Sequence, residues 1–145
     1  MSDDAGGTSL GQAALREAWR LTATAPLRTD HNVCALQVAN RRAAVDRARE
    51  ACLVPECAEQ AQRDLVLLLH NLIGTLLGHA DCNSGYVAEA LSYADKAVDL
   101  QARQLVRAVE AGVEARVVAD IRGILADECE LRAEVRRVAG FELNW

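Results

Sequence analysis

The sequence contains few aromatic residues and few prolines. Aromatic residues make up 3% of its 145 residues, and Pro26 and Pro55 are the two prolines. Sheets are enriched in aromatic and β-branched side chains, and proline interrupts helices, so this composition favours long helices over sheets. The apolar residues are mostly alanine, leucine and valine. The sequence therefore predicts an all-α domain.

The chain also lacks an excess of positive charge. Its formal net charge is −5 at pH 7, so we expect no nucleic-acid-binding surface. Residues 1–8 are acidic and lack the apolar segment of a secretion signal. We expect them to form a disordered tail, followed by a single helical domain at residues 9–145. Because the chain has five cysteines and lacks such a signal, we expect reduced thiols and a cytoplasmic location.

The most apolar stretch runs from Asp64 to His79. At 100° per residue its apolar side chains fill one broad arc, which is typical of a helix that packs against several neighbours. The arc comprises Leu65, Val66, Leu68, Leu69, Leu72, Ile73, Leu76 and Leu77. A membrane-spanning helix needs about 20 such residues, so we expect a central core helix and no membrane span. Gly74 and Gly78 predict the close approach of a neighbouring helix, or else space for a partner beside His70.

Turn signals divide the chain into helices. The expected helices span residues 9–24, 31–53, 56–79, 86–111 and 113–139. Gly112 is the break between the last two; without it, one helix of about 80 Å would suit an extended dimer. We predict the break, and hence a four- to five-helix bundle of antiparallel helical hairpins. The arginines of the second helix are predicted to face solvent; they are Arg41, Arg42, Arg47 and Arg49.

Residues 89–100, EALSYADKAVDL, carry two alanines seven positions apart, Ala90 and Ala97. This segment resembles the second helix of a tetratricopeptide repeat, and Leu69-His70-Asn71-Leu72 resembles the first. The loop between them is longer than in that family, and Gln101 stands where its proline is expected. Residues 65–139 also resemble a microtubule-interacting-and-transport domain, through residues 89–100 and 132–134. An ordinary amphipathic helix is the alternative interpretation.

Either resemblance implies a non-catalytic interaction module that binds a peptide or helix of a protein partner. The partner-binding residues would be His70, Asn71, Gly74 and Thr75. We expect a homodimer that requires no cofactor. No nucleotide-binding loop or nucleophile elbow is present in the sequence, so an enzyme is not expected.

His70, Gly74 and Thr75 support a second hypothesis. An exposed histidine followed four residues later by glycine, and then by serine or threonine, is similar to the site of histidine phosphotransfer proteins. That resemblance implies that His70 is a phosphoacceptor. Ile73 stands where the family has a lysine, which removes a cation that would contact the phosphoryl group. The alternative is a histidine at the edge of the core, hydrogen-bonded to a neighbour.

A third hypothesis concerns two pairs with the spacing His-x-x-Cys, His31 with Cys34 and His79 with Cys82. The second and third helices have nearly equal lengths, so both pairs should meet at one end of their hairpin. Two histidines and two cysteines can form a tetrahedral zinc site there. Disulfides could instead join Cys34 to Cys82 and Cys52 to Cys57, leaving Cys129 unpaired. A third interpretation is that all these cysteines are small buried apolar side chains.

Overall fold

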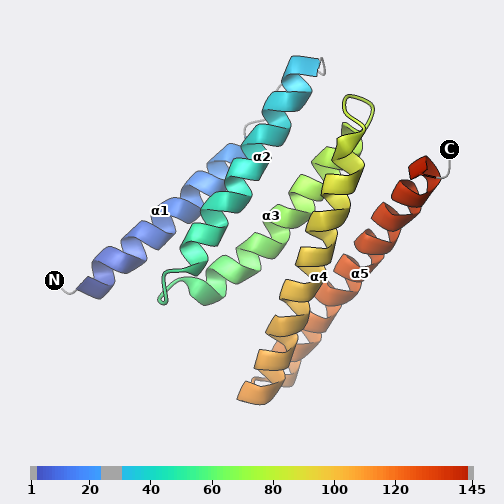
Figure 1. The fold of residues 1–145 in the computed structure, drawn as a ribbon. Helices are drawn as coiled ribbons and strands as arrows, with labels where there is room; N and C mark the ends of the chain where they lie inside the picture. The colour runs from blue at the N-terminus through green and yellow to red at the C-terminus, as the bar shows by residue number, and fades with distance from the viewer. Residues whose placement is uncertain (1–2, 24–30, 144–145) are drawn as a thin grey trace.

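The structure is a computed structural model that describes residues 3–23 and 31–143, with side chains described for residues 11–22 and 34–140. These residues form five helices and no strand, which confirms the predicted all-α fold (Figure 1). The helices are α1 (Asp3–Ala23), α2 (His31–Cys52), α3 (Ala58–Gly78), α4 (Gly85–Ala111) and α5 (Ala115–Leu143). None of the described helices is both long enough and apolar enough to cross a membrane.

The first helix begins earlier than predicted. α1 starts at Asp3, so the expected start at residue 9 lies inside the helix. Residues 3–8 therefore belong to the same helix as the residues that follow them. The predicted end at Thr24 lies outside the described residues.

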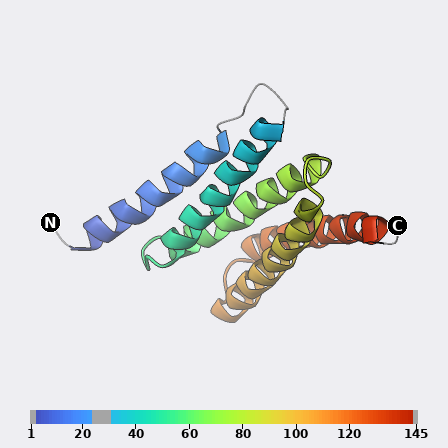
Figure 2. The ribbon, with the colours of Figure 1, turned by 45° about the horizontal axis from the view of Figure 1, so that its top comes forward.

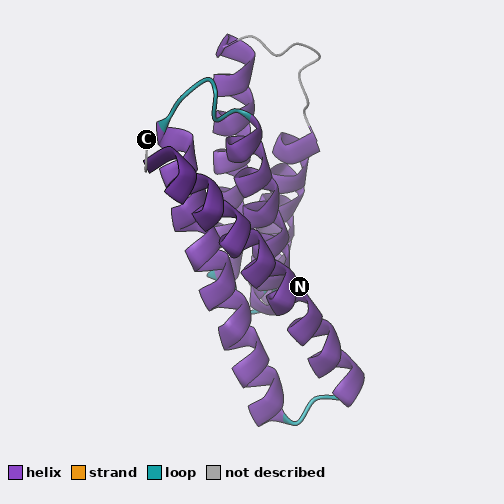
Figure 3. Cartoon of the chain, turned by 90° about the vertical axis from the view of Figure 1, so that its right-hand side faces the viewer, coloured by secondary structure: helices purple, strands orange, loops and turns teal. Residues whose placement is uncertain are grey.

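Each helix packs mainly on the next helix along the chain, in the order α1, α2, α3, α4 and α5 (Figures 1 and 2). α1 also contacts α3 over a short stretch, because both helices pack on α2. The α4–α5 hairpin extends beyond the end of the other helices (Figure 3). This arrangement places α3 in the middle of the array.

The core is built around α3, as the helical arc predicts. Leu68, Leu72 and Ile73 are at most 1% exposed, and the rest of the arc is buried except Leu77, which is partly buried. On α4, Ala90, Ala94 and Ala97 are also at most 1% exposed. Their small side chains allow α4 to approach its neighbours closely. Leu67, on the opposite side of α3, remains 50% exposed.

The close approach predicted at Gly74 and Gly78 is wrong, because a Cβ atom at either position would meet no atom within 4 Å. The close contact lies instead at Gly11 of α1. A Cβ atom there would lie 2.6 Å from Cys57 Sγ and 3.1 Å from Cys57 Cβ. Gly11 therefore lets α1 pass closely over the turn between α2 and α3. Helical periodicity alone does not identify this contact, since it depends on how two helices cross.

We expect Gly74→Ala to stabilise the fold and Gly11→Ala to destabilise it. Alanine in an open helical position raises the free energy of unfolding by about 0.5–1 kcal/mol. At Gly11 the added methyl group must displace Cys57, which lowers that free energy by about 1–3 kcal/mol. Urea denaturation followed by circular dichroism measures both changes. If both substitutions changed the free energy of unfolding in the same direction, α1 would not lie where the structure places it.

The predicted break between the last two helices is confirmed at Gly112. This residue has φ 68°, a left-handed conformation that favours glycine. The Val113 backbone N–H donates to the Ala108 carbonyl, and the Gly112 N–H donates to the Val109 carbonyl, both at 3.2 Å. These two bonds form a Schellman motif, which terminates α4 and lets the chain reverse into α5.

Gly112→Ala should lower the free energy of unfolding by about 1 kcal/mol, because a Cβ atom is unfavourable in the left-handed region. Urea denaturation provides the measurement. Gly123→Ala is the matched control: it lies in the same hairpin, its Cβ would meet no atom within 4 Å, and it should be neutral or stabilising. An equal effect of the two substitutions would contradict the reversal at Gly112.

Candidate metal centre

Three of the four residues predicted as zinc ligands come together. Cys34 lies in the first turns of α2, His79 caps the C-terminus of α3, and Cys82 lies in the loop before α4. Cys34 Sγ lies 3.2 Å from His79 Nδ1 and 3.0 Å from Cys82 Sγ. All three donor atoms lie within 4.8 Å of one another. The predicted meeting of the two His-x-x-Cys segments is thus confirmed for these residues.

The backbone explains how His79 and Cys82 reach Cys34. α2 and α3 run antiparallel, so the start of α2 lies beside the end of α3 (Figure 1). The His79 N–H donates to the Thr75 carbonyl at 3.1 Å, which holds the histidine on the last turn of α3. The Cys82 N–H donates to the His79 carbonyl at 2.9 Å. This tight turn directs the chain back toward α2.

Gln37 orients the histidine ring. Its Oε1 atom lies 2.5 Å from His79 Nε2, so the Nε2–H donates to the amide oxygen and the Nδ1 lone pair faces the sulfurs. Metal-binding histidines commonly hold their second ring nitrogen in this way. Sequence reasoning missed Gln37. Its position three residues after Cys34, on the same face of α2, was the available signal.

The donor set fits a zinc ion. Zinc prefers thiolate and imidazole ligands in tetrahedral geometry. Cys34 is only 1% exposed, so its thiolate would be shielded from solvent. With Zn–S bonds of about 2.3 Å, two tetrahedral sulfur ligands lie about 3.8 Å apart. The two sulfurs must therefore separate by less than 1 Å to accept the ion.

The fourth predicted ligand was His31. This residue begins α2 and lies three residues before Cys34, so it is about one helical turn away along the same helix. Its side chain is outside the described part of the structure. Coordination by His31 therefore stays a prediction.

The cysteines are not joined by disulfides. All five lie within the described residues and form no disulfide there, and the Sγ atoms of Cys34 and Cys82 are 3.0 Å apart, against about 2.05 Å in a disulfide. Burial raises the pKa of the Cys52 thiol, so it is protonated at neutral pH and is a poor metal ligand there. Cys57 packs against Gly11, as a small apolar residue would.

The structure also describes His70 and its neighbours on α3. His70 is 46% exposed at its side chain, and its Nδ1 atom lies 3.0 Å from Oε1 of Glu128, a carboxylate only 2% exposed. With the Nδ1–H donating to this carboxylate, the other ring nitrogen, Nε2, is the one left as an acceptor. Glu128 was missed because no local pattern links it to residue 70, which is 58 positions away.

The other residues predicted to bind a partner lie on the same side of α3. Asn71 and Gly74 are exposed, and Thr75 is partly buried. The Asn71 side-chain oxygen accepts a hydrogen bond from Arg41 Nε at 3.1 Å. The Thr75 hydroxyl donates to the Asn71 carbonyl at 2.9 Å and so is engaged within the helix. Ile73, at the position of the phosphotransfer family's lysine, is fully buried.

Four arginines of α2 were predicted to face solvent, but two of them contact neighbouring helices. The Arg42 guanidinium donates two hydrogen bonds to the Glu89 carboxylate of α4, one of them 2.6 Å long. It also lies 5.9 Å from the ring centre of Tyr86. Partial burial lowers the pKa of Arg41, which contacts Asn71. These contacts connect α2 with both α3 and α4.

Comparisons of the chain with protein-family models, with curated proteins and with solved structures find no match. The resemblances to tetratricopeptide repeats, to microtubule-interacting-and-transport domains and to histidine phosphotransfer proteins therefore stay predictions. Any proposal for the function depends on the geometry of the chain itself.

Proposed function

We propose that this protein is a non-catalytic helical interaction module of the cytoplasm whose helical array is stabilised by a zinc ion. The observation that carries the zinc part is the convergence of Cys34, His79 and Cys82 at one end of α2 and α3. His79 and Cys82 lie 45 and 48 positions after Cys34 in the chain, so the fold brings the three residues together. Two thiolates and an imidazole form a donor set that favours zinc over hard cations.

The ion would act as a cross-link. It would join α2, the end of α3 and the loop before α4, and bound zinc contributes directly to folding stability in sites of this kind. Gln37 would keep the His79 Nδ1 lone pair directed at the metal. His31 is proposed as the fourth ligand.

The exposed side of α3 supports the interaction part of the proposal. His70, Asn71 and Gly74 are exposed there, next to Leu67, an apolar side chain that is half exposed in the middle of the central helix. Gly74 leaves open space above the helix, which would allow a partner helix to approach closely. We propose that this side binds a peptide or helix of a protein partner or of a second copy.

Native mass spectrometry tests the proposal on protein purified under reducing conditions without chelator. One zinc ion per chain is expected, and Cys82→Ser should lose it. Cys129→Ser, a partly buried cysteine of α5 outside the cluster, should keep it. Metal-free wild-type protein would overturn the zinc part, and the same spectrum reports whether the protein is a monomer or the expected homodimer.

A second candidate function is histidine phosphotransfer through His70. The favouring observation is the contact between His70 Nδ1 and the buried Glu128 carboxylate, which leaves Nε2 as the nucleophilic nitrogen of a half-exposed ring. Mixing the protein with a phosphorylated receiver domain tests this function. Label transfer to wild-type protein but not to His70→Gln would support it, and no transfer, or equal transfer to both, would remove it.

A further inference from the structure

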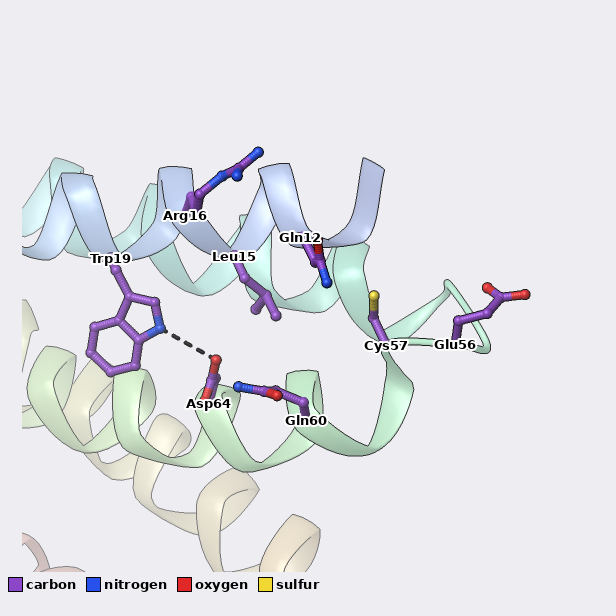
Figure 4. Close-up of a pocket in the computed structure, with 8 residues that line it drawn as sticks. All are labelled: Gln12, Leu15, Arg16, Trp19, Glu56, Cys57, Gln60 and Asp64. Carbon is purple, nitrogen blue, oxygen red and sulfur yellow. Dashed lines mark hydrogen bonds between the residues drawn. The ribbon is translucent and has the colours of Figure 1, made fainter. Parts of the chain in front are cut away.

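A groove of about 510 Å³ lies between α1 and α3 (Figure 4). Both helices pack on α2 and contact each other only over a short stretch, so a channel is left between them. The side chains directed into it are Gln12, Leu15 and Trp19 from α1, Gln60 and Asp64 from α3, and Cys57 from the turn before α3. The groove is distinct from both the cysteine cluster and His70.

The indole of Trp19 forms one end of the groove. Its Nε1–H donates to Asp64 Oδ2 at 3.3 Å, yet the residue is 39% exposed (Figure 4). An exposed tryptophan held in one orientation by a hydrogen bond is typical of residues that contribute strongly to protein–protein binding.

The charge inside the groove is negative. The carboxylate of Asp64 points into it, whereas Arg16 and Glu56 stand at the rim and point away (Figure 4). Beside this carboxylate are the amides of Gln12 and Gln60, and Leu15 and Cys57 supply buried apolar surface. The whole chain has a net charge of −5, which attracts basic partners.

These features match the side chain of arginine. A guanidinium group can pair with a carboxylate through two hydrogen bonds and can stack on an indole ring at the same time. Its aliphatic stem can pack along apolar side chains such as Leu15. Lysine has the charge but not the planar group, so it would use only part of the site.

The shape favours a segment of protein over a small molecule. The groove is open to solvent along one side, as the exposure of Trp19 shows, whereas small-molecule sites usually bury most of their ligand. Its α1 wall runs from Gln12 to Trp19, about 10 Å along the helix, which suits a few residues of a partner. We infer that the groove between α1 and α3 binds a segment of a protein partner through an arginine that stacks on Trp19 and pairs with Asp64.

The test begins with selection of displayed 12-residue peptides on the full-length reduced protein. Selected peptides should be enriched in arginine, and replacing that arginine with citrulline, which has a similar shape and no charge, should weaken binding at least tenfold. Asp64→Asn should weaken binding similarly, while the asparagine oxygen can still accept the Trp19 hydrogen bond. Glu56→Gln, at a residue that points away from the groove, is the matched control and should bind as wild type does.

Nuclear magnetic resonance locates the bound peptide. The chain has two tryptophans, and the spectrum of a Trp19→Phe variant identifies the Trp19 indole resonance, which should shift on titration. Peptides without arginine, equal binding by Asp64→Asn, or an unchanged Trp19 resonance would each overturn the inference. Saturable binding of N-acetyl-arginine amide without any peptide binding would also overturn it, because the ligand would then be a small guanidinium compound. None of these outcomes depends on zinc, so this experiment and the zinc experiment test the two proposals independently.

Discussion

Zinc is expected to raise the free energy of unfolding of the reduced, metal-free protein by about 4 kcal/mol when its free concentration is a thousand times the dissociation constant. The ion would bind Cys34, His79 and Cys82 together only in the folded chain, because they come from three separate segments. Urea denaturation in buffers of defined free zinc concentration measures the effect.

Two substitutions sharpen this experiment. Cys82→Ser removes one thiolate and should abolish the response to zinc, because a serine hydroxyl is a far weaker zinc ligand. Cys129→Ser leaves the cluster intact and should keep the full response. The same stability with and without zinc would show that the cluster is a group of packed thiols and not a metal site.

Leu72→Ala should lower the free energy of unfolding by about 3–5 kcal/mol, the upper part of the range for leucine in a core. Leu72 is fully buried on the central helix, between elements that cannot all move inward to fill the space. Leu67→Ala on the same helix is the matched control. Leu67 is 50% exposed, so its loss should change the free energy by less than about 1 kcal/mol.

Chemical denaturation of the two variants under identical reducing conditions compares them directly. A small effect of Leu72→Ala, or an effect of Leu67→Ala that matches it, would mean that α3 does not occupy the centre of the array. Because both substitutions remove the same atoms from one helix, their difference reports burial and not helix propensity.

The features predicted correctly from the sequence are local. The arc of α3 follows from helical periodicity, and the end of α4 follows from the tolerance of Gly112 for a left-handed conformation. The meeting of Cys34 with His79 and Cys82 needed one additional assumption, that two helices of equal length form a hairpin. That assumption holds because the α2–α3 turn is short.

The features that were missed depend on how separate helices cross. A glycine is needed at position 11 only because α1 passes over Cys57. The residues around either position carry no pattern that predicts this crossing. The same is true of Arg42 with Glu89 and of His70 with Glu128, which are pairs of common residues far apart in the chain. Periodicity indicates which face of a helix is buried but not which side chain of another helix it meets.

The packing of each helix on the next also has a kinetic consequence. Chains whose contacts join nearby segments have low contact order and fold rapidly, because little loop-closure entropy opposes each step. Such a chain can form its first hairpins before its later helices have been synthesised. The contact of Cys34 with Cys82 closes a loop of 48 residues, so it can form only after α3 has packed on α2. A zinc ion bound there would therefore slow unfolding more than it would speed folding.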